Sequence, residues 1–290
     1  MIGLLLLLSH YVTTAASSVA GADVAGRGRT CVVLPKAASA AEVNARCAIA
    51  DQPCLIKGGL ATAGWAPRLD LNSLLERFPD HQFKTQGFQN TTTLKAYLDE
   101  PASTGRNTPA YIWDGASGGA MTPTMNALHA SVPDRYVSAM SAFKAGRIST
   151  STFSLGKQGS GFYWHVHGPA ITGLISGRKR WFFYTTKEMR ALSAEAKQGL
   201  MDADGHEGRA HSAKWAQETL PSITDELRPI ECMQEPGDFL YLPDKRHHST
   251  INQEDVTVGV TWEAVRKVRC MGRSASPDGL CWPDQLRDEL

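Results

Sequence analysis

Three stretches in the second half of the chain decide its fold. Residues 159–169 read Gly-Ser-Gly-Phe-Tyr-Trp-His-Val-His-Gly-Pro, and residues 175–184 read Ile-Ser-Gly-Arg-Lys-Arg-Trp-Phe-Phe-Tyr. Residues 236–252 read Pro-Gly-Asp-Phe-Leu-Tyr-Leu-Pro-Asp-Lys-Arg-His-His-Ser-Thr-Ile-Asn. Each stretch joins an apolar or aromatic run to glycine or proline turns, a pattern typical of strands. Short strands separated by glycine turns predict an antiparallel barrel or jelly roll.

The second stretch also predicts how two strands are connected. Ser176-Gly177-Arg178 lies between the apolar runs 172–175 and 179–184, which predicts a hairpin. Further strands are expected over 111–113, 153–155, 161–167, 239–242 and 256–262.

The first half of the chain carries helical patterns. Apolar residues at helical spacing predict a helix over 69–78, and a second helix is predicted over 91–98, which starts with capping residues and then turns apolar. An exposed helical region is expected over 187–220, and irregular structure over 23–60.

Three histidines form the candidate site. His165 and His167 are two residues apart in an expected strand, and alternate residues of a strand point to one face. His248 follows on another expected strand, so three imidazoles can meet as a facial metal site. A structural or surface histidine pair is the alternative interpretation, because short motifs often match by chance.

In order and spacing, the three quoted stretches resemble the JmjC family of cupin-fold iron(II)/2-oxoglutarate oxygenases. The resemblance covers roughly residues 65–265 and is strongest over 151–262. It implies a mainly β domain with flanking helices, built as a double-stranded β-helix of the jelly-roll or cupin type.

The resemblance assigns roles to individual residues. His165 matches the first iron ligand, and His248, five residues after Pro243, matches the last one. Lys179 matches the lysine that pairs with the C5 carboxylate of 2-oxoglutarate. The alternative is that Lys179 is exposed on the hairpin while Arg178 or Arg180 points inward.

Other residues near these positions are expected to line the same pocket. Thr250 and Asn252 follow His248 at strand spacing, and Tyr163 lies two residues before His165. Simple core packing is the alternative for all three. His247 stands where the family usually has an aromatic residue, and is expected to pack nearby.

Two positions depart from the family pattern. The family pattern is H-x-D or H-x-E, but residue 167 is histidine, so a bound metal would keep a charge of +2 instead of +1. Three imidazoles also suit zinc and occur in cupin thiol dioxygenases. Phe162 stands where many catalytic relatives have a hydroxyl residue that holds 2-oxoglutarate.

Three functions remain open. The first is an iron(II)/2-oxoglutarate-dependent protein hydroxylase, with no catalytic residue assigned beyond the metal ligands. The second is a non-catalytic module that acts through protein contacts, and the third is a three-histidine thiol dioxygenase. Histone demethylation is disfavoured by the targeting signals described below.

Composition supports a folded chain that does not bind nucleic acid. The 290 residues are 42% hydrophobic and 20% charged, enough for a sizeable core. The formal net charge is +1 without a basic block, which gives no electrostatic reason to expect nucleic-acid binding.

Both termini carry targeting patterns. Residues 1–22 resemble a signal peptide, with an apolar core that is too short to span a bilayer and a small-residue cleavage site before Asp23. A buried helix or a membrane anchor is the alternative. Arg287–Leu290 is a close variant of the Lys-Asp-Glu-Leu retrieval signal, unless it is a chance acidic tail. Together they predict the endoplasmic reticulum lumen, a retrieval receptor as partner and a luminal protein as substrate or partner.

Cysteines and a glycosylation sequon agree with that compartment. Disulfides are expected, although their connectivity cannot be read from the sequence. Asn90 lies in an Asn-Thr-Thr sequon. The six cysteines are Cys31, Cys47, Cys54, Cys232, Cys270 and Cys281.

The chain is therefore divided into four parts. A signal peptide (1–22) precedes a cysteine-containing segment (23–64), the JmjC/cupin domain (65–265) and a C-terminal tail (266–290).

Overall fold

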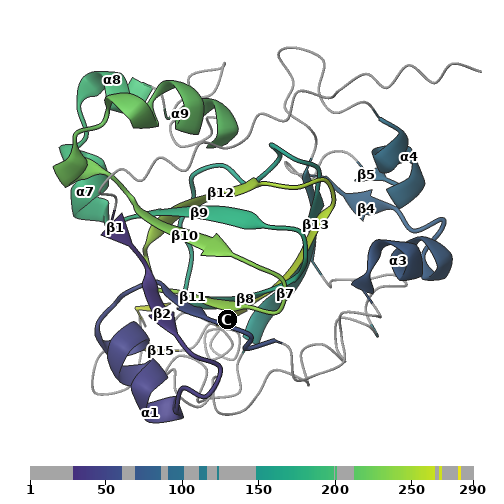
Figure 1. Cartoon of the computed structure of the whole chain (residues 1–290), viewed down its shortest axis with the longest axis horizontal. Coiled ribbons are helices and arrows are strands. Elements are labelled where there is room, and N and C mark those ends of the chain that lie inside the picture. The colour runs from purple at the N-terminus through teal and green to yellow at the C-terminus, as the bar shows by residue number, and fades with distance from the viewer. Residues whose placement is uncertain are drawn as a thin grey trace, which may run out of the picture.

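Two β-sheets lie face to face in the computed structural model of the chain (Figure 1). The larger sheet has the strand order β2 (Val32–Leu34), β3 (Cys54–Ile56), β11 (Phe239–Leu242), β8 (Ala170–Ser176), β13 (Thr257–Ala264), β7 (Ile148–Gly156) and β6 (Tyr111–Gly115). The smaller sheet has the order β1 (Arg29–Thr30), β10 (Ile230–Gln234), β9 (Lys179–Tyr184) and β12 (His247–Asn252). The structure describes residues 29–60, 69–85, 91–100, 111–115, 123, 148–198, 200, 212–264, 268–269 and 280–281.

Helices and two small sheets surround this core. The helices are α1 (Ala40–Val43), the π-helix η1 (Asn44–Ile49), α3 (Leu71–Arg77), α4 (Leu94–Asp99), α7 (Thr186–Ala191), α8 (Ala194–Gln198), α9 (Ser212–Glu218), and the 3₁₀ turns η2 (Leu220–Ser222) and η3 (Asp225–Leu227). The small sheets pair β4 (Phe83–Lys84) with β5 (Thr91–Thr92), and β14 (Val268–Arg269) with β15 (Leu280–Cys281). The predicted mainly β jelly roll with flanking helices is confirmed.

Alternation along β9 separates two packing layers. Trp181 and Phe183 point between the sheets, where they pack with Leu240 of the larger sheet. Phe182 and Tyr184 point to the opposite face and pack under α7–α9. The strand is therefore buried on both faces, which is why its sequence is almost continuously aromatic.

The helices α7–α9 cover the outer face of the smaller sheet. Leu192 and Trp215 are buried against it, so the predicted exposed helical region is exposed on one side only. A large apolar side chain contributes roughly 1.5–3 kcal/mol when it is fully buried. This layer therefore anchors the smaller sheet.

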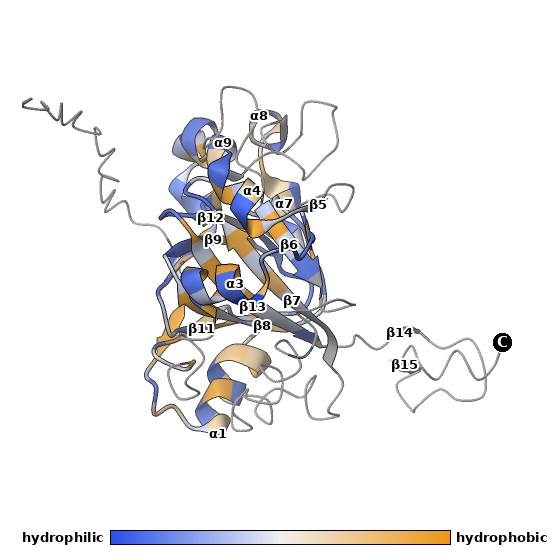
Figure 2. Cartoon of the chain, turned by 90° about the vertical axis from the view of Figure 1, so that its right-hand side faces the viewer, coloured by the Kyte–Doolittle hydropathy of each residue, from blue (hydrophilic) through white to orange (hydrophobic). Residues whose placement is uncertain are grey.

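The outer face of the larger sheet is covered by elements from the first half of the chain. Tyr97 of α4 and Leu74 of α3 pack with residues such as Trp262 of β13. Side-chain oxygens of Asp70 and Thr93 accept bonds from backbone N–H groups at the starts of these two helices. The helices α3 and α4 show hydrophilic and hydrophobic faces, as such packing requires (Figure 2).

The predicted hairpin at residues 176–178 is wrong. The strands β8 and β9 are consecutive in sequence but belong to different sheets, because β9 already pairs with β10 and β12. Gly177 has φ +73°, and a Cβ there would lie 2.7 Å from the Cα of Thr257. Glycine is thus required where the chain crosses between sheets.

The predicted strand 161–167 is also wrong, for a reason that matters to the site. This stretch runs antiparallel to β12, where Phe162 pairs with Thr250 and His165 pairs with His248. Between these two pairs the stretch contains one residue more than β12 does. Three residue steps on one side oppose two on the other, as in a β-bulge. At Gly161 a Cβ would lie 1.9 Å from the carbonyl oxygen of Thr250, so only glycine permits this approach.

The prediction of irregular structure for residues 23–60 is wrong over the described part. There β1 joins the smaller sheet, and β2 and β3 extend the larger one. The predicted helix 91–98 begins only at Leu94, because Thr91 and Thr92 form β5. Apolar periodicity cannot detect pairing between segments that are far apart in the sequence.

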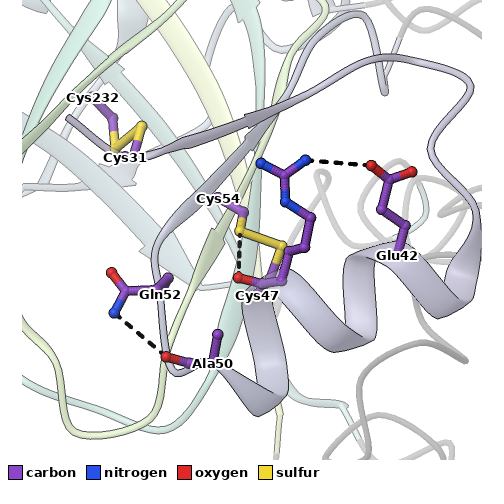
Figure 3. The surroundings of a disulfide bond; sticks show 8 residues. Cys31, Glu42, Cys47, Ala50, Gln52, Cys54 and Cys232 are labelled. Atoms are coloured by element: carbon purple, nitrogen blue, oxygen red, sulfur yellow. Dashed lines mark hydrogen bonds and ion pairs between the residues drawn. A yellow bond between two sulfur atoms is a disulfide. The ribbon is translucent and has the colours of Figure 1, made fainter.

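Two disulfides fix the N-terminal elements to the sheets (Figure 3). Cys31 lies where the chain passes from β1 to β2 and is bonded to Cys232 of β10. Cys47 of η1 is bonded to Cys54 of β3. The predicted disulfides are confirmed for these four cysteines.

Several predictions fall outside the described residues. These are the signal peptide, Asn90, Cys270 and Arg287–Leu290. Among the helices that the structure does describe, none has the length and apolar character required to span a membrane.

Candidate metal centre and its pocket

Three imidazoles converge between the two sheets. One ligand nitrogen each from His165, His167 and His248 lies within 4.8 Å of the other two. The predicted convergence of the three histidines is therefore present. Its origin differs from the prediction, since His165 and His167 lie on the irregular stretch and only His248 lies in a regular strand.

Backbone pairing holds His165 against His248. The amide of His165 donates to the carbonyl of His248 at 3.0 Å, and the amide of His248 donates to the carbonyl of His165 at 2.9 Å. Lys245 N–H donates to the carbonyl of His167 at 3.1 Å. The positions of all three histidines are thus set by main-chain bonds.

A backbone carbonyl orients each imidazole. Nδ1 of His165 lies 2.8 Å from the carbonyl oxygen of Tyr163, and Nδ1 of His248 lies 2.8 Å from that of Arg246. Nδ1 of His167 lies 2.6 Å from the carbonyl oxygen of Gly168. Because a carbonyl oxygen only accepts, each Nδ1 carries the proton and each Nε2 keeps a lone pair for a metal.

Burial keeps two of the imidazoles neutral. It lowers the pKa of His165 to about 3, with a further contribution from the nearby His167. Burial likewise lowers the pKa of His248 far below its ordinary range, helped by His165 and His167. Neutral imidazole is the form that binds metal, so neither histidine would need to lose a proton to bind one at neutral pH.

A carboxylate lies behind the third imidazole. Oε1 of Glu263, near the end of β13, is 3.8 Å from Nδ1 of His167. The same oxygen accepts a bond from the amide of Gly168 at 3.3 Å. The motif pattern gave no signal for Glu263, because it lies 96 positions beyond His167 in sequence (263 − 167).

Lys179 points into the same pocket and is only 2% exposed. Its Nζ donates to the hydroxyl of Tyr111 at 3.0 Å and to that of Ser154 at 3.3 Å. No carboxylate of the described residues forms a salt bridge with it. The alternative of an inward arginine is excluded, since Arg178 is exposed and Arg180 pairs with Glu231.

The pocket between Lys179 and the histidines has aromatic walls and a volume of about 300 Å³, its open mouth included. None of its lining residues is acidic. These residues are Tyr111, Trp113, Phe162, His165, His167, Lys179, Trp181, Leu242, His248, Thr250 and Thr261.

The other predicted pocket residues are placed differently. Thr250 lines the pocket, whereas Asn252 is buried beside it and bonds to the hydroxyl of Ser160. Tyr163 is half-buried and does not line the pocket, because the extra residue in the stretch puts Phe162 there instead. His247 lies on β12 outside the histidine cluster.

Phe162 fills space beside the metal centre. Its ring centroid lies 4.5 Å from that of His165 and 4.9 Å from that of Trp113. Sequence reasoning missed Tyr111 and Trp113 as pocket residues, and Ser154 as a partner of Lys179. Their only signal was a position in an expected strand, which does not reveal the opposing side chain.

Comparisons with known proteins agree with this geometry. Residues 152–263 match the family model described as JmjC domain, hydroxylase. Over 107 residues the chain is 32% identical to JmjC domain-containing protein 8 of Homo sapiens, covering 37% of this chain and 35% of that protein. The protein of the same name from Rattus norvegicus is 33% identical over 107 residues, with the same coverage of 37% and 35%.

A plant protein is also similar to this chain. Over 117 residues the chain is 35% identical to lysine-specific demethylase JMJ21 of Arabidopsis thaliana, covering 39% of this chain and 12% of that protein. The chain therefore spans about a third of the length of JmjC domain-containing protein 8 and 12% of the length of the plant demethylase.

Proposed function

We propose that the chain uses residues 152–263, which match the JmjC family model, as an iron(II)- and 2-oxoglutarate-dependent oxygenase that hydroxylates a protein. The observation that carries the proposal is the shared pocket. Three imidazoles stand at one end, and a buried lysine that forms no salt bridge with any described carboxylate stands at the other. A metal-chelating dicarboxylate is the ligand class that satisfies both ends at once.

The residues present fit a divalent metal. The three imidazoles would hold the metal through Nε2, and a site with three protein ligands would leave room for cosubstrate and dioxygen. When bound, iron(II) supplies the activation of dioxygen, which protein side chains cannot perform.

The chain's own residues bind and orient the cosubstrate. The Nζ of Lys179 is held by Tyr111 and Ser154 and would receive a distal carboxylate. Burying a cation is costly unless it is paired, so an anion in this position removes that cost. Trp181 and Phe162 form apolar walls that exclude water from the reacting atoms.

The overall reaction is balanced by the cosubstrate. A substrate C–H, dioxygen and 2-oxoglutarate give a C–OH, succinate and carbon dioxide. One oxygen atom enters the hydroxyl group and the other enters succinate, so no further reductant is needed.

The test is anaerobic titration of the purified full chain with iron(II) and then 2-oxoglutarate. A visible charge-transfer band that requires both additions, and that is lost in His248→Ala, is the expected result. Iron binding without the band would overturn the 2-oxoglutarate reaction and leave the thiol dioxygenase. No bound iron, with zinc checked separately, would instead favour a non-catalytic module.

We further propose that the protein works in the endoplasmic reticulum lumen. The signal-like residues 1–22 and the tail Arg287–Leu290 motivate this location. The two disulfides support it, because such bonds form and persist in oxidising compartments. A retrieval receptor that reads the tail is the partner, and the substrate is a luminal protein.

Removal of the last four residues tests the location. The truncated chain should appear in the medium of expressing cells, while the full chain stays inside and carries a glycan at Asn90. A matched control replaces Ser274 and Ser276, which leaves the tail intact. Retention of the truncated chain, or its presence in the cytosol, would contradict the proposal.

A further inference from the structure

A metal bound by the three histidines and the ammonium group of Lys179 would place two positive centres in one pocket that has no acidic ligand. Three neutral imidazoles would leave a bound dication with its full charge, and Lys179 adds another positive charge in the same pocket. Because no described residue that lines the pocket is acidic, any negative charge that the protein itself contributes before a cosubstrate binds must come from outside the lining.

We propose that Glu263 is a positioning residue for His167 that supplies this negative charge from behind the ligand. The inference rests on the proposed function in one respect, that the three histidines bind a divalent metal. It adds a role for a residue that does not itself touch the metal.

Strand alternation directs Glu263 toward the site. On β13 the side chains of Val260 and Trp262 pack on the outer face of the larger sheet. Thr261 points inward and lines the pocket, and Glu263 follows two residues later on the same face. The carboxylate therefore reaches the rim of the pocket from a regular strand.

The contacts place the carboxylate on the outer side of the imidazole. Oε1 is 3.8 Å from Nδ1 of His167 and accepts the amide of Gly168, whose carbonyl holds the same Nδ1 at 2.6 Å. Glu263 thus fixes the loop that orients the ring, and its charge stabilises the Nδ1 proton. Nε2, on the other side of the ring, stays available to the metal.

The chemistry is that of a carboxylate–histidine–metal arrangement. A carboxylate beside the distal nitrogen raises the basicity of the ligand and orients it. The side chain of Glu263 is 27% exposed, so water screens its charge only in part. Glu263 then supplies, from behind His167, the negative charge that none of the three histidines carries.

Glu263→Gln tests the charge separately from the hydrogen bond. Glutamine keeps a carbonyl oxygen for the Gly168 amide but has no charge. We expect cobalt(II) affinity of the full chain to fall about 10- to 100-fold, the usual effect of losing an outer partner of a metal ligand. The matched control is Glu254→Gln, an exposed carboxylate beside Arg178, which should leave the affinity unchanged.

A double-mutant cycle distinguishes charge compensation from a structural role. His167→Asp brings a carboxylate directly to the metal, so Glu263→Gln in that background should lower the affinity much less. The iron(III)/iron(II) potential should rise in Glu263→Gln and return in the double variant.

Two results would overturn the inference. One is an unchanged cobalt(II) affinity in Glu263→Gln, and the other is an equal loss in both backgrounds, which would indicate general loosening of the loop. If the unmodified protein binds no divalent metal, the proposed function fails first and this inference fails with it. The three cases are distinguishable, because the unmodified protein is titrated in the same series.

Discussion

The two ends of the pocket are built in different ways. At the metal end, backbone carbonyl oxygens orient the side chains, and main-chain bonds between His165 and His248 set their spacing. At the other end, side-chain hydroxyls of Tyr111 and Ser154 hold the ammonium group of Lys179. The metal end therefore depends on the path of the chain, and the cation end depends on individual side chains.

This difference means that the two ends can be broken separately. A change at the metal end should abolish both metal binding and any cosubstrate binding that needs the metal. A change at the cation end should weaken anion binding and leave the metal in place.

The largest effect is expected at the metal end, from His248→Ala. It removes a buried ligand, so cobalt(II) or zinc affinity should fall by more than about 100-fold, beyond the loss typical of an outer partner. Equilibrium titration with a competing chelator measures the change. His247→Ala is the matched control, because this neighbour lies outside the cluster; equal losses in both variants would contradict the assigned ligand set.

The next effect is expected at the cation end, from Lys179→Met. Hydrogen bonds to charged groups contribute about 1.5–3 kcal/mol, so 2-oxoglutarate affinity of the metal-loaded protein should fall about 10- to 100-fold. Metal affinity should stay the same, as measured in parallel titrations. Arg178→Met, an exposed change one residue away, should alter neither value; loss of metal in Lys179→Met would show that the two ends are not separable.

Acid should destabilise the metal-free protein through His165. Its pKa is lowered from 6.5 to about 3, so the unfolded state binds more protons between these values. The contribution to stability is complete above pH 6.5 and is lost as the pH falls toward 3. In urea unfolding between pH 7 and 4, the unfolding free energy should fall more steeply with decreasing pH for the native chain than for His165→Gln. Equal pH dependence of the unfolding free energy in the two proteins would contradict this prediction.

The smallest effect is expected one step behind His248. Arg246, whose carbonyl orients that imidazole, is buried and donates to the carboxylate of Asp51 at 3.1 Å. Asp51 is 61% exposed and has φ +50° in the loop closed by Cys47 and Cys54. Asparagine tolerates that backbone conformation and keeps an oxygen for Arg246, so Asp51→Asn should cost no more than about 1 kcal/mol of unfolding free energy.

Metal affinity in Asp51→Asn should fall less than about tenfold, the smallest loss typical of residues that hold a metal ligand from behind. Thermal unfolding and the same cobalt(II) titration measure the two quantities. A metal loss as large as that of Glu263→Gln would show that the disulfide-closed loop, and not β12 pairing alone, positions His248.

Sequence patterns were sufficient for the jelly-roll class and for the main chemical groups. Histidine spacing indicated the three ligands, and Lys179 was identified from the resemblance; the structure places all four in one pocket. Helices were predicted over 69–78 and 91–98, and the structure has α3 (Leu71–Arg77) and α4 (Leu94–Asp99) in these stretches. These features depend on neighbours in sequence, and local patterns record such neighbours directly.

The tertiary structure alone decided how those groups meet. The chain crosses between sheets at Gly177 instead of forming a hairpin, and the extra residue before His165 exchanges Tyr163 for Phe162 in the pocket. The partners of Lys179 and of His167 come from strands whose separation in sequence carries no local signal. Register and long-range pairing are set by the packing of whole sheets, so the sequence determined the reactive groups and the tertiary structure determined their neighbours.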